Sequence, residues 1–472
     1  MSKEQANSTQ AGAKEESGGL YEKHKKVYAK SVRGYFDNWR VAAVLFSQLL
    51  YYGLCWLPWN DRQAVLFHLV ERKFYIFGLV LWPQDVIYLA ILLVISAYSL
   101  FLFTAVAGRL FCGYACPQTV YTQLFMWIEN SIEGDRAKRM KLDARPMDGH
   151  KFMLKATKIT IWILFSLWTS ITLVGYFTPI KELMHGIAAF DLGPWETFWI
   201  LFYAGFTIMQ AGFLREQVCK YMCPYARFQG VMFDPDTLVI TYDPERGEPR
   251  GARKKSETGH QDGKGDCVDC GICVQVCPTG IDIRQGLQYE CIGCAACIDA
   301  CDVVMEKIGL PKGLIRYSTE NALDKHYTKK DILRHIFRPR IALYTGILGL
   351  IVLVSGWSLA NRIPLKVDVI RDRGALAREA DDGRTENVYT LRIMNTDESP
   401  RRFDLSVMGL EGIELVGDRL VDVAGAETKT VLVAVRVNPE VGKKGTNQIF
   451  FDVKSESDSS VAVHEKAAFI QP

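Results

Sequence analysis

Long apolar stretches alternate with polar, charged stretches along most of the chain. Five apolar stretches carry almost no charge over about 20 residues, the length of helix that crosses about 30 Å of hydrocarbon. They cover residues 39–57, 86–106, 159–177, 195–214 and 341–360. A soluble core helix seldom stays apolar on every face for so long, so the pattern predicts a multi-pass α-helical membrane protein with about five transmembrane helices. A further stretch, 74–82, is too short to span and is expected to be re-entrant or interfacial.

The positive charges between these stretches predict the sidedness of the chain. There are seven Lys and Arg residues before the first stretch and nine in the loop 109–158. There are only three between the first and second stretches and one in 178–194. Cytoplasmic loops carry an excess of Lys and Arg. We therefore expect the polar, disordered tail 1–37, the loop 109–158 within the four-helix segment 38–214, and the insert 215–340 on the cytoplasmic side of a bacterial inner membrane.

The last part of the chain changes to an alternation of period two, which is typical of strands. Alternating runs separated by turn-prone residues occur at 388–394, 402–407, 428–437, 447–453 and 461–470. They predict a periplasmic immunoglobulin-like β-sandwich over 364–472, after the fifth helix at 341–360. Because this part has no cysteine and a single histidine, His464, we expect it to serve docking or stability.

The amino-acid composition argues against nucleic-acid binding and favours metal ligation. The formal net charge of +3 on 472 residues gives no case for nucleic-acid binding. Of the 13 cysteines, twelve fall in short regular spacings between Cys112 and Cys301. This pattern is typical of metal ligation in a reducing compartment and not of a secreted disulfide framework.

Eight of these cysteines form two runs of spacing x2-x2-x3 in the insert, within an expected ferredoxin-like domain at 258–310. Three thiolates at this spacing can hold three corners of a cubane, and the fourth ligand comes from elsewhere. Zinc is the alternative from ligand type, but two complete runs favour two [4Fe-4S] clusters.

The two runs resemble those of two-cluster bacterial ferredoxins, in which the fourth ligand comes from the other run. The resemblance implies that one cluster is held by Cys267, Cys270, Cys273 and Cys301. It implies that the second cluster is held by Cys291, Cys294, Cys297 and Cys277. One departure is Asp302, which follows Cys301 where the family usually has proline, and it puts the local turn in question.

The second and fourth stretches both end in Cys-x3-Cys-Pro, which indicates an internal repeat. We call residues 107–117 the first elbow and residues 211–224 the second elbow; their cysteines, the elbow cysteines, are Cys112, Cys116, Cys219 and Cys223. If each helix continues through its pair, the two thiols share one face and the following proline ends or kinks the helix. The nearby cations are expected to lower the thiol pKa values; they are Arg109, Arg215 and Lys220.

Four thiolates can then converge on one site at the cytoplasmic membrane face. Cu(I) suits such soft ligands, while an iron–sulfur cluster or zinc also fits the ligand type. The alternative is that these cysteines are small packing residues at helix ends.

With these residues considered together, the chain resembles the FixG/CcoG/RdxA family of cytochrome oxidase accessory proteins over nearly its whole length. The resemblance rests on residues 74–85, 109–118 and 219–224, the double cluster motif and the β-sandwich. It implies an inner-membrane cupric reductase that supplies Cu(I) for assembly of the cbb3-type cytochrome c oxidase. The electrons would pass through the clusters to copper held at Cys112, Cys116, Cys219 and Cys223.

The implied partners are membrane lipid and the oxidase assembly machinery or copper chaperones, with an unknown electron donor. The sequence does not decide whether the chain forms a homo-oligomer. Two other functions stay open: a subunit that passes electrons from quinol to a partner reductase, and a non-catalytic assembly scaffold in which the clusters are structural.

Overall fold

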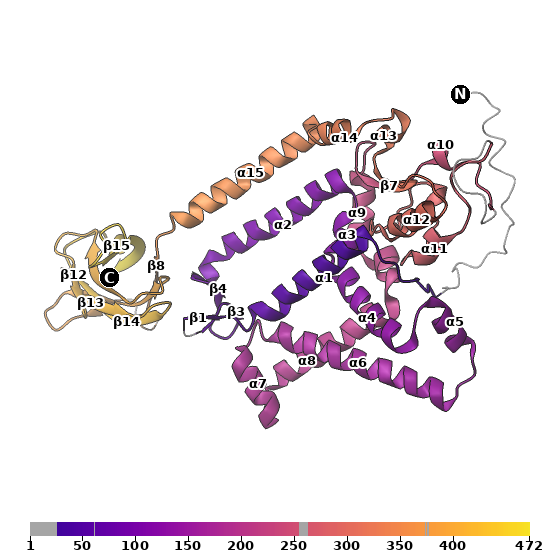
Figure 1. Cartoon of the computed structure of the whole chain (residues 1–472). Helices are drawn as coiled ribbons and strands as arrows, with labels where there is room; N and C mark the ends of the chain where they lie inside the picture. The colour runs from indigo at the N-terminus through magenta and orange to yellow at the C-terminus, as the bar shows by residue number, and fades with distance from the viewer. Residues whose placement is uncertain (1–25, 61, 254–262, 373, 375–376) are drawn as a thin grey trace, which may run out of the picture.

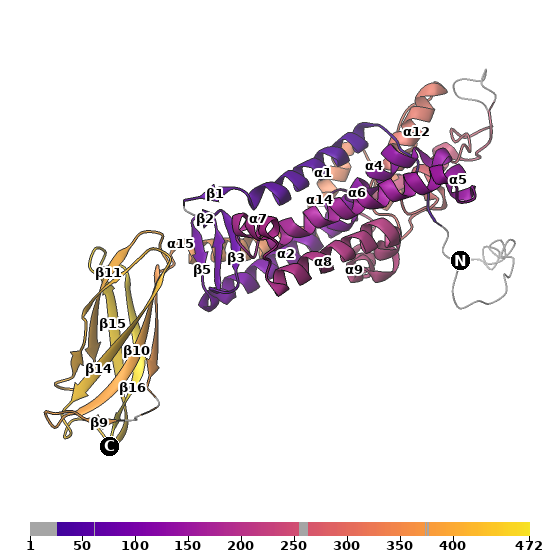
Figure 2. The same ribbon diagram turned by 90° about the horizontal axis from the view of Figure 1, so that it is seen from below.

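The computed structural model describes residues 26–60, 62–253, 263–372, 374 and 377–472. Figure 1 shows a β-sandwich at one end, long helices in the middle, and short helices and loops at the far end. Figure 2 shows the same succession from below. The first 25 residues of the expected disordered tail and residues 258–262 of the expected ferredoxin domain lie outside the described residues. The described part of that tail is ordered, because Tyr28 and Lys30 make specific hydrogen bonds and Tyr35 begins a helix.

Long apolar helices form the middle part. Among the described residues, four helices are long and apolar enough to cross a membrane: Pro83–Ala107, Gly149–Val174, Pro194–Leu214 and Pro339–Ala360. They contain α2 (Val86–Ala107), α6 (Gly149–Val174), α8 (Pro194–Thr207) and α15 (Pro339–Ala360). The remaining expected span, 39–57, forms α1 (Tyr35–Leu54), whose polar start with Asp37 and Arg40 makes it less apolar. The number of five spans stays a prediction.

Two layers of helices pack side by side. Helices α2 and α15 run alongside each other (Figure 1), and the Tyr88 hydroxyl lies 3.1 Å from that of Ser358. Helix α6 packs against α8 and α4 (Pro117–Glu133) around a small core of Phe125, Trp162 and Ala211. The shorter helices of this part are α3 (Leu110–Tyr114), α5 (Arg136–Ala144), α7 (Ile180–Ala189) and α9 (Pro224–Met232).

A small antiparallel sheet joins the helices to the β-sandwich. Its strands are β3 (Val65–His68), β4 (Lys73–Ile76) and β5 (Leu79–Leu81), and beside it lies the pair β1 (Pro58–Trp59) and β2 (Arg62–Gln63). The stretch 74–82 is therefore a β-hairpin and not a re-entrant piece. Its buried residues pack on Met394 of the sandwich, and Asp85 pairs with Arg362 at 3.2 Å.

The C-terminal part is a two-sheet sandwich, which confirms the predicted fold. One sheet has the order β12 (Glu414–Val416), β14 (Thr428–Val437), β10 (Thr385–Asn395), β8 (Leu365–Arg371), with β9 (Arg378–Glu379) beside β10. The other has the order β13 (Leu420–Val423), β11 (Arg401–Met408), β15 (Gly445–Ser455), β16 (Ala462–Gln471). Alternate residues of the long strands, such as Tyr389 and Phe451, fill the core between the sheets.

The far end contains the ferredoxin part. Strands β6 (Val239–Tyr242) and β7 (Ile315–Ser318) pair antiparallel, and helices α11 (Ile272–Val276) and α12 (Ala296–Lys307) begin within the cysteine runs. The remaining helices here are α10 (Pro244–Gly247), α13 (Glu320–Asp324) and α14 (Lys329–Ile336). Helix α12 continues past Asp302, whose carboxylate accepts a hydrogen bond from the Gly313 N–H at 2.9 Å. Asp302, in place of the usual proline, thus lies within the helix and links α12 to the following loop.

Candidate metal and redox centre

The eight cysteines of the two runs lie in two groups in the ferredoxin part. The first cysteine group consists of Cys301 on α12 and three thiols within its electrostatic reach, Cys267, Cys270 and Cys273. The second cysteine group consists of Cys297 and three thiols that act most strongly on it, Cys277, Cys291 and Cys294. These are the crosswise sets that the ferredoxin resemblance implies, and the ligand assignment itself stays a prediction. Cys270 is exposed, whereas the other seven are buried or half-buried.

Each group offers four thiols, the ligand set of a cubane cluster. Each thiolate of a [4Fe-4S] cluster binds a different iron. Over the described ranges, no three His, Cys, Asp or Glu side chains are close enough to hold one metal ion.

The four elbow cysteines also come together. The thiol of Cys219 lies within electrostatic reach of the other three, which are Cys112, Cys116 and Cys223. Cys112 lies on α3, and Cys219 lies on the π-helical turn η3 (Val218–Met222). The two elbows, far apart in the sequence, thus present four thiols to one region. Cys55, by contrast, is fully buried near Val174 and donates a hydrogen bond to the Tyr52 carbonyl.

The prolines of the elbows begin helices and do not end them. Cys116 and Cys223 have extended backbones, with ψ angles of 127° and 111°. Pro117 and Pro224 occupy the first positions of α4 and α9, where the missing N–H costs nothing. Neither helix therefore continues through its cysteine pair, which was the condition for the two thiols to share one helix face. The thiols approach through short, separate turns.

The predicted lowering of the thiol pKa values was also wrong. Burial raises the pKa of Cys112 to about 11 and that of Cys219 to about 12, and the opposing effect of Arg109 is smaller. The guanidinium of Arg215 pairs with Glu129 at 2.9 Å instead. Desolvation of the thiolate thus outweighs the nearby positive charge.

A residue that the sequence analysis missed contacts the first elbow. Gln229, on α9, is fully buried, and its amide Nε2 donates a hydrogen bond to the Sγ of Cys112 at 3.3 Å. Helix α9 directly follows the second elbow, so this bond joins the two halves of the repeat. A glutamine in the last turns of a short helix gives no local signal for such a role.

The elbow cysteines pack directly on the second cysteine group. Cys112 and Cys219 contact an apolar cluster that includes Cys294 and Ile292. A Cβ atom added at Gly113 would lie 2.9 Å from the backbone nitrogen of Cys294, so only glycine allows this close approach. The ferredoxin part is thereby held against the first elbow.

A cavity of about 380 Å³ borders Cys219 at the surface. Its charged lining residues are Arg109, Lys220, Arg227 and Glu290. It gives a small ligand a route to the second elbow.

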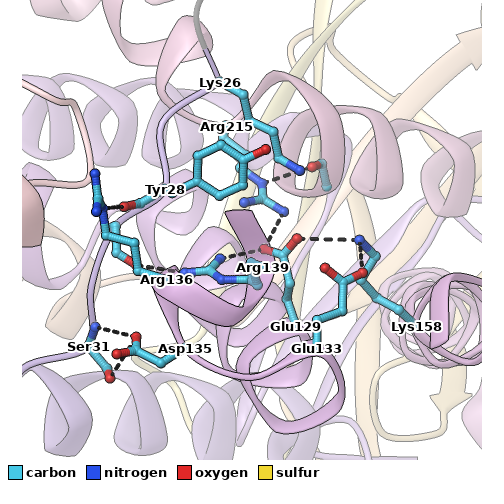
Figure 3. A network of polar contacts seen from close by, with 12 residues as sticks. Lys26, Tyr28, Ser31, Glu129, Glu133, Asp135, Arg136, Arg139, Lys158 and Arg215 are labelled. Atoms are coloured by element: carbon cyan, nitrogen blue, oxygen red, sulfur yellow. Dashed lines mark hydrogen bonds and ion pairs between the residues drawn. The ribbon is translucent and has the colours of Figure 1, made fainter. Parts of the chain in front are cut away.

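A buried ion network holds the second elbow against α4. Figure 3 shows the Glu129 carboxylate among three cations: Arg215 at 2.9 Å, Arg139 at 3.0 Å and Lys158 at 3.3 Å. Burial alone would raise the pKa of Glu129, but the three cations outweigh it and lower the pKa to about 2. The carboxylate is therefore charged at neutral pH and fixes Arg215 in place.

Comparison with known proteins places the chain in a family. A 4Fe-4S dicluster domain matches residues 214–320, a 4Fe-4S binding domain matches residues 89–133, and the IG-like fold at the C-terminal of FixG matches residues 355–472. The protein RdxA of Cereibacter sphaeroides is 37% identical over 93% of this chain and 95% of its own length. The nitrogen fixation protein FixG of Rhizobium meliloti is 36% identical over 83% of this chain and 81% of its own length. The chain belongs to the FixG/RdxA family.

Membership of the FixG/RdxA family makes the chain an iron–sulfur electron-transfer protein with apolar helices suited to a membrane. A crystal structure of a FixG-related protein from Vibrio parahaemolyticus covers 23% of this chain and 96% of its own length, at 25% identity and a TM-score of 0.21.

Proposed function

We propose that this member of the FixG/RdxA family is a membrane-bound oxidoreductase that reduces Cu(II) to Cu(I) at the elbow cysteines. The Cu(I) would serve assembly of a cbb3-type cytochrome c oxidase, through its assembly machinery or copper chaperones. The distribution of Lys and Arg supports a cytoplasmic position for both cysteine-rich parts. The sandwich lies at the opposite end of the helices, which supports a periplasmic position for it.

The observation that carries this proposal is the contact between the elbows and the second cysteine group. Gly113 approaches the backbone of Cys294 so closely that a side chain would not fit. A metal held by Cys112 or Cys219 would thus lie next to one predicted cluster site. A binding site without a redox role has no need of this contact.

The elbow thiols favour the product of the proposed reaction. Reduction adds one electron to Cu(II) and breaks no bond, and thiolate sulfur prefers the softer Cu(I). Two thiolates suffice for Cu(I), so two of the four elbow cysteines are enough to hold it. Clusters held by the two cysteine groups supply electrons one at a time.

The test compares three purified proteins: the wild type, a variant with all four elbow cysteines changed to serine, and the control Cys55→Ser. Each is reduced without oxygen and mixed with Cu(II), while visible absorption follows the clusters and a chromogenic chelator captures Cu(I). We expect the wild type and the control to produce Cu(I) as their clusters reoxidise. The elbow variant should keep its cluster absorption and lose this reaction. If the variant reduces Cu(II) at the wild-type rate, the site is elsewhere; if no protein responds to Cu(II), the quinol-linked or scaffold function replaces it.

One observation favours a second candidate, in which the elbows hold a third iron–sulfur cluster. The 4Fe-4S binding domain that matches residues 89–133 contains Cys112 and Cys116 and lies outside the dicluster match. Iron analysis distinguishes the candidates, because a third cluster would give the wild type four more irons per chain than the four-serine variant.

A further inference from the structure

A cavity of about 620 Å³ lies beside the second cysteine group, away from the route to Cys219. Its lining comes from the N-terminal segment 29–33, the start of α1, the middle and end of α4, and residues that flank cluster cysteines, among them Val276 and Pro278. Small-molecule sites usually enclose roughly 300–1,000 Å³. The cavity is therefore large enough for a cofactor-sized molecule next to one predicted cluster.

The N-terminal wall of this cavity is held in place by specific bonds. The Lys30 N–H donates to the Gln275 carbonyl at 2.8 Å. The Tyr28 hydroxyl donates to Asp143 at 2.7 Å, and Arg139 donates to the Ala29 carbonyl at 2.6 Å. Figure 3 shows Tyr28 and Ser31 of this segment beside Asp135 and Arg136, where α5 begins. This wall is thus an ordered part of the fold.

Two buried polar atoms of the lining residues have no hydrogen-bond partner in the described part of the chain. They are Nε of Arg40, a donor, and Oδ1 of Asn130, an acceptor. Another nitrogen of Arg40 pairs with Asp37 at 2.5 Å, so the guanidinium is fixed. A buried group without a partner costs about 1–3 kcal/mol, and a ligand that offers both an acceptor and a donor would remove this cost.

The remaining lining residues favour an anionic, aromatic ligand. The cations Lys30, Arg33 and Arg40 outnumber the single carboxylate of Asp37 among the charged lining residues. Trp127 adds an aromatic surface on which a planar ring can pack. A neutral quinol would use the ring surface but not the excess positive charge.

We propose that this cavity binds a flavin nucleotide whose reduced form is the electron donor of the protein. The pyrimidine edge of the flavin ring carries an N–H for Asn130 and carbonyl oxygens for Arg40, and the phosphate pairs with Lys30 and Arg33. A positive charge at this edge stabilises the reduced, anionic ring. The reduced flavin releases two electrons, one to each oxidised cluster, and its proton passes to water. The proposal goes beyond the proposed function, because it concerns the entry of electrons and needs no copper.

The test uses the full-length, cluster-loaded protein in detergent and flavin mononucleotide as the probe. Binding is followed by quenching of flavin fluorescence, and reduction by the loss of visible cluster absorption after mixing with reduced flavin in the absence of copper. We expect saturable binding and a reduction rate that levels off with flavin concentration. Asn130→Leu and Arg33→Glu should each weaken binding by about tenfold, the effect of one charged or buried hydrogen bond.

The matched control is Lys141→Gln, which removes an exposed cation of α5 outside the cavity lining. It should bind flavin as the wild type does, and all variants should keep the wild-type cluster absorption. Flavin binding that does not saturate, or cavity variants that bind like the control, would show that the cavity holds only water. Saturable reduction by a water-soluble quinol but not by flavin would assign the cavity to quinol and overturn the proposal. Because copper is absent, neither result depends on the cupric reductase proposal.

Discussion

The two elbows turn the chain in the same way at equivalent positions but with different residues. Four residues before the first cysteine of each pair stand Gly108 and Arg215. Gly108 has φ 54° and ψ −121°, and Arg215 has φ 44° and ψ −113°. A short helical turn and Cys-Pro then follow in both. The internal repeat is thus a repeat of backbone geometry.

The two residues hold this geometry by different means. Glycine adopts a positive φ freely, whereas a residue with a side chain is strained there. Arg215 is fixed by its ion pair with Glu129, by the Gly212 carbonyl at 2.9 Å and by the ring of Trp162. Glu129 lies on α4, which begins at the end of the first elbow. The first half of the repeat therefore supports the strained turn of the second half, so the two elbows are not independent.

Removal of the Glu129 charge should have the largest effect on the coupling between the two elbows. Glu129→Gln leaves the buried Arg215 and Arg139 without their anion, while Lys158 keeps its ion pair with Glu133 at 2.7 Å. The loss of a buried partner costs about 3–5 kcal/mol. We expect a clear drop in the melting temperature and loss of Cu(I) production, because Arg215 is no longer held in its turn. Thermal unfolding in detergent and the copper assay measure the two effects.

The control for this variant is Glu306→Gln. Glu306 pairs with Lys312 at 3.2 Å, but both side chains are mostly exposed, so the change should alter stability by less than about 1 kcal/mol. If Glu129→Gln melts like this control, the ion network does not support the second elbow.

A side chain in the first elbow should have an intermediate effect. In Gly108→Ala, the added Cβ would lie 2.8 Å from the Leu238 carbonyl oxygen, at a φ that alanine rarely adopts. We expect a destabilisation of about 1–3 kcal/mol, measured by thermal unfolding. Gly205→Ala is the matched control, because its Cβ meets no atom within 4 Å, and it should melt at or above the wild-type temperature. Equal melting of the two variants would show that Gly108 has no special conformational role.

The large features could be predicted from the sequence because they follow from local patterns. Long apolar runs gave the helices that could span a membrane, and period-two runs gave the long strands of the sandwich, such as β10 and β15. Strand β8 was missed although Leu365, Val367 and Val369 alternate with polar residues. The short strands β9, β12 and β13 were missed because two to four residues carry too little alternation. The spacing within the two cysteine runs likewise predicts cluster ligands without knowledge of the rest of the chain.

The features that were missed or wrong depend on distant parts of the chain. The pKa values of Cys112 and Cys219 are raised by burial, which outweighs the effect of the neighbouring Arg109. Arg215 was expected to act on these thiols, but α4 supplies its partner. The stretch 74–82 is apolar because it packs on the sandwich, more than 300 residues later in the chain. Contacts between residues so far apart in the chain cannot be predicted from the local sequence.

The smallest effect should come from the bond that joins the two elbows. Gln229→Leu keeps the side-chain size but removes the hydrogen bond to the Cys112 sulfur. Stability should change by about 1 kcal/mol or less, because a neutral bond to sulfur is weak and leucine suits a buried position. The sulfur–copper absorption band of the Cu(I)-loaded or Cu(II)-loaded protein should shift, since this bond withdraws charge from one ligand.

The variant Gln229→Glu tests whether Gln229 acts on the Cys112 sulfur through its hydrogen bond or only fills space. The carboxylate has nearly the same shape, but once ionised it can only accept hydrogen bonds. It therefore repels the Cys112 sulfur when this binds copper as a thiolate, and should slow Cu(I) production more than leucine does. Below the pH at which this glutamate gains a proton, it can donate again, and the rate should recover toward the wild-type value. A copper assay over a range of pH measures this, with the wild type as the reference at each pH. If both variants slow the reaction equally at every pH, Gln229 only fills space, and the coupling of the elbows rests on the Glu129 network alone.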